Sequence, residues 1–166
     1  MKTLLATTAL ILAFSSPAYA YDKGTVAYGL GYVEVFDDVN NAVQGNVEYR
    51  SADFSKDTIG VEGFSWMAGV EADTNTSGYV YTGLLYDLPL TDKISLTPSV
   101  GAGFYREGEG KDLGGSFEFR DTIEVNYKLD ESSRIGLSLS HKSSAGVHDR
   151  NPGVETMQVV YSQNIQ

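Results

Sequence analysis

Cysteine is absent from the 166 residues, and histidine and proline are scarce, with two and four copies. Without cysteine the chain has no disulfides, no thiolate nucleophile and no cysteine-bound zinc or iron–sulfur site. Two histidines are too few for a multi-histidine metal centre, so we expect neither a metal nor a cofactor. The 12 Lys and Arg residues are outnumbered by 22 Asp and Glu. An acidic chain of this kind lacks the positive surface that general nucleic-acid binding requires.

Long hydrophobic runs are also missing after the first 20 residues. The leader combines an early lysine, an apolar run from Leu4 to Phe14 and the small residues of Ala18-Tyr19-Ala20, which is typical of a cleaved secretory signal peptide. An uncleaved membrane anchor is the alternative, but the run has about half of the ~20 residues that a spanning helix needs. We therefore expect a signal peptide over residues 1–20 and one domain over residues 21–166.

The remaining sequence alternates, with apolar or aromatic residues at every second position of eight segments. A period of two is typical of β-strands, whose successive side chains point to opposite faces. The largely apolar sets, at alternate positions, run over Val26–Tyr32, Val43–Tyr49, Phe64–Val70, Tyr79–Leu85, Ile94–Phe104, Phe117–Tyr127, Ile135–Leu139 and Met157–Tyr161. The third segment is expected to begin near Thr58 with a bulge at Gly63, and no helix is evident.

Eight segments with their turns suit the ~10-residue strands of a small membrane barrel. The opposite parity would then line the lumen, where Glu48, Arg50, Glu118, Arg120 and Glu124 are expected to pair. Export, and aromatic residues toward the segment ends, favour lipid outside. The sequence thus predicts an all-β chain, an eight-stranded antiparallel transmembrane β-barrel in the outer membrane. A soluble lipocalin-like barrel remains the alternative, because parity alone does not say which face points outward.

Three polar residues interrupt the apolar face of the last two segments. Counting by twos from Leu139 reaches His141 and Ser143, and counting back from Met157 reaches Glu155. Residues i and i+2 of a strand lie ~7 Å apart and cross-strand neighbours about 5 Å apart, so the three groups come within reach. One interpretation is a Ser–His–Glu nucleophile system, in which Ser143 attacks, His141 is the base and Glu155 orients the imidazole. The other places all three at headgroup level without a special role.

Three stretches of the C-terminal half resemble a known family. They are GFYREGEGKDLGGSFEFR (Gly103 to Arg120), SHKSSAG (Ser140 to Gly146) and NPGVE (Asn151 to Glu155), and they are similar to regions of the lipid A 3-O-deacylase (PagL) family. The N-terminal half is similar only in strand pattern and length. The resemblance implies an eight-stranded outer-membrane barrel acting as a carboxylic ester hydrolase, which removes the acyl chain at position 3 of lipid A and releases a 3-hydroxy fatty acid.

The resemblance also implies roles for five residues. Ser143 matches the nucleophile, His141 the base and Glu155 the orienting acid. Asn151 matches the side chain of the oxyanion hole, and Gly146 supplies the matching backbone N–H. The implied partner is lipid A, or lipopolysaccharide, in the outer leaflet beside the barrel, and a homodimer is compatible with the sequence.

Four cations lie near the same end of the expected barrel: Arg106, Lys111, Lys142 and Arg150. One interpretation is that some of them hold lipid A phosphates through charge-assisted hydrogen bonds, and the other is that they are solvated rim charges. Two rival functions also stay open. They are a non-enzymatic structural or adhesive outer-membrane barrel, in which replacing Ser143 changes nothing, and a soluble ligand-binding barrel with its aromatic residues around a cavity.

Overall fold

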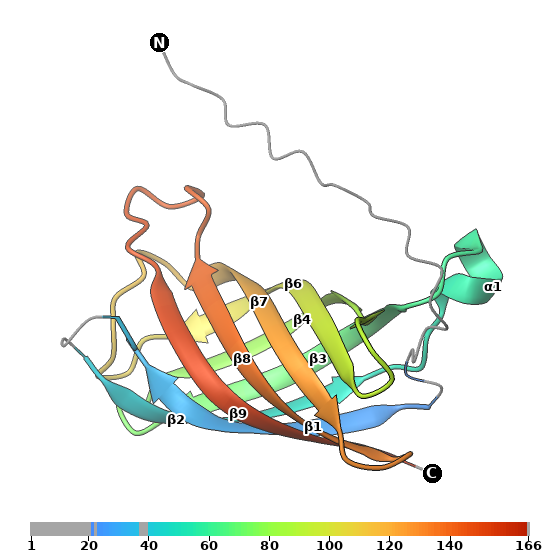
Figure 1. Cartoon of the computed structure of the whole chain (residues 1–166). Coiled ribbons are helices and arrows are strands. Elements are labelled where there is room, and N and C mark those ends of the chain that lie inside the picture. The colour runs from blue at the N-terminus through green and yellow to red at the C-terminus, as the bar shows by residue number, and fades with distance from the viewer. Residues whose placement is uncertain (1–20, 22, 37–39, 166) are drawn as a thin grey trace.

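The computed structural model describes residues 21, 23–36 and 40–165, so the predicted signal peptide lies outside the described residues. The strands are β1 (Thr25–Val33), β2 (Ala42–Arg50), β3 (Phe64–Asp73), β4 (Gly78–Tyr86), β5 (Leu88–Pro89), β6 (Ile94–Arg106), β7 (Phe117–Lys128), β8 (Ser133–Ser143) and β9 (Val154–Asn164). All pairings are antiparallel, and β1 with β9 and β4 with β6 close the barrel (Figure 1). Because the short β5 continues β4 along β6, eight strands cross the barrel, as predicted.

The barrel has two distinct ends. The loop end carries the connections β1–β2, β3–β4, β6–β7 and β8–β9, and the turn end carries both ends of the described chain. A short helix, α1 (Ser55–Ile59), also lies at the turn end, between β2 and β3 (Figure 1). No helix in the described ranges is long and apolar enough to cross a membrane.

Helix α1 corrects two predictions, that no helix is present and that the third strand begins near Thr58 with a bulge at Gly63. The strand begins at Phe64 instead. Asp53 stabilises the irregular connection, since its carboxylate accepts hydrogen bonds from Ser55 N and Gly63 N, both at 2.7 Å. Burial opposes ionisation of Asp53, but these hydrogen bonds outweigh it and lower the pKa of its carboxyl. Gly63 has φ 114°, a turn conformation that alternation does not reveal.

The outer face of the barrel is apolar and the inner face is largely polar. Leu30, Val100 and Ile123 are 64%, 59% and 58% exposed on the outside, whereas most of the alternate positions are buried or partly buried. Aromatic pairs lie at both rims: Tyr49–Trp66 and Phe64–Tyr86 at the turn end and Phe104–Phe117 at the loop end. Apolar residues outside and aromatic girdles are typical of a transmembrane β-barrel. The soluble alternative is excluded, because it requires the apolar set inside.

The fourth segment does not follow the predicted parity. Tyr79, Tyr81 and Leu85 point into the barrel, and Val80 and Leu84 face outward. Both parities of β4 are apolar, so alternation did not distinguish them, and only the register with β3 and β6 decides the faces. Inside, the two tyrosine rings stack with centroids 5.3 Å apart and help to fill the lumen.

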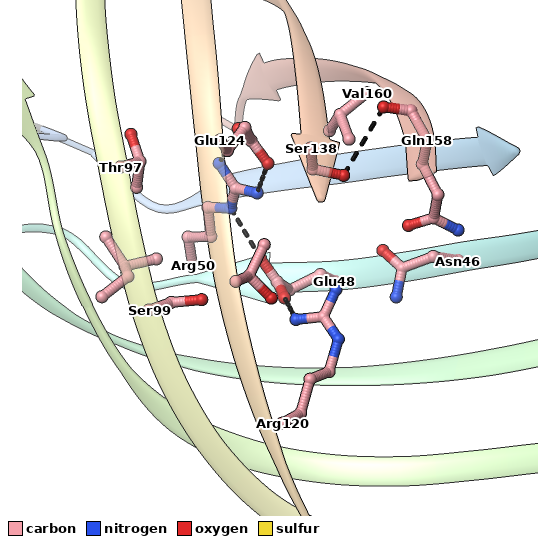
Figure 2. A pocket seen from close by; sticks show the side chains of 12 residues that line it. Asn46, Glu48, Arg50, Thr97, Ser99, Arg120, Glu124, Ser138, Gln158 and Val160 are labelled. Carbon is pink, nitrogen blue, oxygen red and sulfur yellow. Dashed lines mark hydrogen bonds and ion pairs between the residues drawn. The ribbon is translucent and has the colours of Figure 1, made fainter. Parts of the chain in front are cut away.

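Charged side chains inside the barrel pair much as predicted. Arg50 donates to both carboxylate oxygens of Glu124, at 2.9 and 2.8 Å, and its Nε donates to Glu48 Oε1 at 2.7 Å (Figure 2). Arg120 Nη1 lies 3.9 Å from Glu48 Oε2. Glu118 departs from the prediction, because its buried carboxylate oxygens have no hydrogen-bond partner among the described residues. The space that these side chains leave is only water-sized, so the lumen is filled.

Replacing Arg50 by methionine is expected to destabilise the barrel by about 3–5 kcal/mol, because the buried carboxylate of Glu124 loses the arginine that neutralises it and Glu48 loses the nearer of its two arginines. The measurement is the unfolding midpoint in detergent, in urea or on heating. The control is Val47→Met on the outer face of the same strand, expected to lie within about 0.5 kcal/mol of the parent protein. Equal midpoints for the two variants would show that the Arg50 network adds no stability.

Candidate active site

Polar side chains interrupt the apolar outer surface at the loop end, where β8 ends and β9 begins. His141 and Glu155 face each other across the two strands, and His141 Nδ1 lies 2.9 Å from Glu155 Oε1. Their side chains are 45% and 34% exposed, so the pair lies on the outside of the barrel and not in the lumen. Ser143 is two residues further along β8 on the same face and is half-buried.

The contact with Glu155 determines which imidazole nitrogen can act as a base. A carboxylate at Nδ1 favours the tautomer with hydrogen on Nδ1, which leaves the lone pair on Nε2. Ser143 and His141 are alternate residues of one strand, so their Cα atoms lie about 7 Å apart, a span that the two side chains can bridge. The arrangement therefore combines a hydroxyl, a base and a carboxylate that orients the base.

Gly153 leaves the space that the imidazole occupies. It has φ 61°, and a Cβ built on it would lie 2.5 Å from His141 Cε1 and 3.2 Å from Nε2. A side chain at this position would push the ring away from its place. The next residue, Val154, is buried with Leu113 of the β6–β7 connection at the mouth of the barrel. The backbone of Gly153 and Val154 therefore contacts His141 on the outside and is anchored by Val154 at the mouth of the barrel.

A second carboxylate flanks the imidazole. Asp121 of β7 is the cross-strand neighbour of His141 on the side away from Glu155, and it is exposed on the outer face. Sequence reasoning missed it, although counting by twos from Phe119 to Ile123 passes through it. Within the described structure, Glu155 is the acid that is hydrogen-bonded to the ring.

The chain turns sharply after Ser143. Ala145 and Gly146 have φ values of 51° and 82°, and the N–H of Val147 donates to the carbonyl of Ser144 at 3.0 Å. A Cβ built on Gly146 would meet no atom within 4 Å, so this backbone is open to an approaching ligand. The turn holds Gly146 three residues from Ser143, on the loop that follows β8.

Asn151 folds back to the start of this turn. Its Oδ1 accepts two hydrogen bonds from Ser144, from the backbone N at 2.8 Å and from Oγ at 3.0 Å. Because the amide oxygen is engaged there, the amide nitrogen Nδ2 remains a donor. The structure therefore brings Asn151, predicted as an oxyanion donor, to the residue next to Ser143. The sequence did not predict the contact between Ser144 and Asn151, because it forms only when the loop folds back.

The β6–β7 connection braces the β8–β9 connection. A Cβ on Gly114 would lie 2.3 Å from the carbonyl oxygen of Arg150, and a Cβ on Gly115 would lie 2.2 Å from His148 Nε2, so two glycines allow direct packing. Arg150 also donates to Asp112 Oδ2 at 2.5 Å. The backbone hydrogen bond from Gly114, together with Arg150, lowers the pKa of the Asp112 carboxyl.

The four cations considered for phosphate binding have different surroundings. Lys142 points into the lumen, where its Nζ donates to Glu71 Oε2 at 2.7 Å, so the hypothesis was wrong for this residue. The reason is parity, because position 142 faces inward when position 141 faces outward. Lys111 and Arg150 are ion-paired with carboxylates. Arg106 is exposed at the loop end of β6.

Comparisons with known sequences identify the family to which this chain is similar. The sequence profile of the family described as lipid A 3-O-deacylase (PagL) matches residues 37–164. A curated relative, the lipid A deacylase PagL of Bordetella bronchiseptica, is 42% identical over 52 residues. That match covers 31% of this chain and spans only 29% of the length of the relative.

Comparisons with solved structures concern the fold. The crystal structure of the outer membrane enzyme PagL is similar with a TM-score of 0.65 and 20% identity, over 85% of this chain and 99% of that one. A de novo designed transmembrane β-barrel has a TM-score of 0.57 and 11% identity, over 90% of this chain and 100% of that one. The crystal structure of Neisserial surface protein A has a TM-score of 0.54 and 9% identity, over 86% of this chain and 96% of that one. At such low identities these similarities show the barrel fold alone.

Proposed function

The chain belongs to the lipid A 3-O-deacylase (PagL) family, and from this premise we propose that it is an outer-membrane ester hydrolase that removes the 3-O-linked acyl chain of lipid A. The contact of His141 Nδ1 with Glu155 Oε1, beside Ser143 on the outer face, supports the proposal most directly. Ionisable groups on a membrane-facing surface are costly, and such groups by default indicate a functional site. A substrate in the outer leaflet reaches such a site without leaving the bilayer.

The first half of the proposed reaction transfers the acyl group to the protein. Ser143 Oγ attacks the ester carbonyl carbon while His141 Nε2 takes the hydroxyl proton. The resulting oxyanion is stabilised by the Nδ2 of Asn151 and the backbone N–H of Gly146. Collapse breaks the bond to the sugar oxygen at position 3, which receives the proton from His141, and leaves the acyl group on Ser143.

The second half returns the site to its starting state. A water molecule gives a proton to His141 Nε2 and attacks the acyl carbon, and a second oxyanion forms on the same donors. Collapse releases the 3-hydroxy fatty acid, and Ser143 regains its proton from His141. The carboxylate of Glu155 stabilises the imidazolium that forms in both halves. Since all five groups belong to one chain, the reaction needs no homodimer.

Export and orientation complete the proposal. We propose that residues 1–20 are a signal peptide that directs the chain to the outer membrane, and that the loop end faces the cell exterior. The site would then be level with the outer leaflet, where lipopolysaccharide lies. An exposed Arg106 at this end is available to lipid A phosphates, whereas Lys142 in the lumen is not.

The test is mass spectrometry of lipid A from cells that express the protein, compared with cells that express a barrel without this site. We expect loss of one 3-hydroxyacyl mass from lipid A and appearance of the matching free fatty acid. Correct insertion is checked by the change in gel mobility between unheated and heated samples. Unchanged lipid A in the presence of a correctly inserted barrel would contradict the enzyme and favour the structural or adhesive role.

A further inference from the structure

We propose that Ser144 is a positioning residue, which holds the carboxamide of Asn151 so that its Nδ2 faces the oxyanion formed at Ser143. The inference rests on the proposed esterase function and adds a residue to it. Ser144 is fully buried, although it lies at the rim of the barrel beside the half-exposed Ser143. Burial at this position indicates that Ser144 acts within the protein and is not a second nucleophile.

The two hydrogen bonds settle which end of the carboxamide faces Ser144. The backbone N–H of Ser144 lies 2.8 Å from Asn151 Oδ1 and can only donate. Turning the amide over would place its NH2 group against this N–H, two donors facing each other. The Ser144 hydroxyl, 3.0 Å from the same oxygen, adds a second donor. The Nδ2 atom is therefore on the other side of the carboxamide, free for an incoming oxyanion.

The backbone around Asn151 is held by other contacts, so its side chain carries the remaining freedom. Pro152 restricts the preceding residue to extended conformations. Arg150, on the other side, is tied to Asp112 and packs against Gly114. Asn151 itself is exposed, and in the described part of the chain Ser144 is the residue whose hydrogen bonds orient its carboxamide.

An oxyanion donor is effective only when it is oriented before the charge forms. Removing the Ser144 hydroxyl leaves one hydrogen bond on Asn151 Oδ1, and the exposed carboxamide then samples orientations that turn Nδ2 away. We expect Ser144→Ala to lower kcat about tenfold with little change in KM, because the donor acts on the transition state and not on bound substrate. Removing the donor itself, in Asn151→Ala, should cost about 100- to 1,000-fold.

The experiment is a double-mutant cycle on the full-length protein in detergent micelles containing lipid A. The kcat and KM of the parent, Ser144→Ala, Asn151→Ala and the double variant are measured, with the unfolding midpoint of each. If Ser144 acts through Asn151, its substitution has no further effect once Asn151 is alanine, so the double variant equals Asn151→Ala. A general structural role would instead lower the rate by the same factor in both backgrounds.

Two more variants keep the test decisive. Asn151→Asp retains an oxygen for both Ser144 donors but presents no N–H, so its kcat should be as low as that of Asn151→Ala. Ser144→Cys retains the side-chain shape with a weaker donor, and its kcat should lie between those of the parent and Ser144→Ala. The cysteine variant takes the place of the alanine variant in the test if Ser144→Ala does not fold. Additive losses, or a parent-like kcat in Ser144→Ala, would overturn the proposal. An inactive parent protein would instead refute the esterase function.

Discussion

Ser143→Ala is expected to lower the rate of lipid A deacylation by at least about 10,000-fold, while the barrel inserts and unfolds as the parent protein does. Ser143 is the hydroxyl that shares a strand face with His141 on the outer surface. The neighbouring Ser144 does not replace it, because that hydroxyl is buried and donates to Asn151. Only the residual effect of the oxyanion donors and of substrate binding would remain in the variant.

The measurement is the release of 3-hydroxy fatty acid by equal amounts of inserted protein, together with the lipid A mass spectrum. Ser140→Ala provides the matched control, since Ser140 is on the same strand but faces the lumen, and we expect parent-like rates from it. Release that persists in the Ser143 variant would retain the esterase but remove Ser143 as its nucleophile. Equal losses in both serine variants would point to damage of β8.

Glu155→Gln is expected to reduce kcat by about 1,000- to 10,000-fold with KM nearly unchanged. A glutamine amide can donate to His141 Nδ1, where the carboxylate now accepts at 2.9 Å. The imidazole would then carry its hydrogen on Nε2 and could not take the proton of Ser143. The variant also loses the negative charge that stabilises the imidazolium during the reaction.

Asp121→Asn is the matched comparison, an acid-to-amide exchange on the opposite side of the same imidazole. Because Glu155 is the acid that is hydrogen-bonded to the ring, we expect Asp121→Asn to lose no more than about tenfold in kcat. Single-turnover rates of the two variants, measured in the same micelles, make the comparison. Equal losses would show that both acids orient the base, and a larger loss in Asp121→Asn would contradict the assignment to Glu155.

Much of the fold follows from alternation along the chain, and the predictions fail where other contacts decide the structure. Seven of the eight predicted segments have their apolar set on the outside, as expected. In the fourth, Tyr79 and Tyr81 turn inward, because both of its faces are apolar and the register with β3 and β6 decides. The turn at Gly63 and the helix Ser55–Ile59 were missed because contacts with Asp53, outside the alternating pattern, stabilise them.

The candidate site was likewise predicted in part from the sequence. That His141, Ser143 and Glu155 share one face followed from counting by twos, since strand geometry repeats every second residue. The same count contains Asp121, which was overlooked, and it places Lys142 in the lumen, where the structure finds it. The roles of Ser143 and Asn151 remain proposals that the variants above test.

The order of residues along the chain is enough to set the strand pattern, the apolar outer face and the three polar residues that break it, because each depends on a repeat along one or two strands. Which loops meet depends instead on how the barrel closes. The hydrogen bonds from Ser144 to Asn151, and the packing of Gly114 against Arg150, join residues whose separation follows no repeat. Such contacts arise when the closed barrel brings two irregular connections together, and alternation carries no information about them.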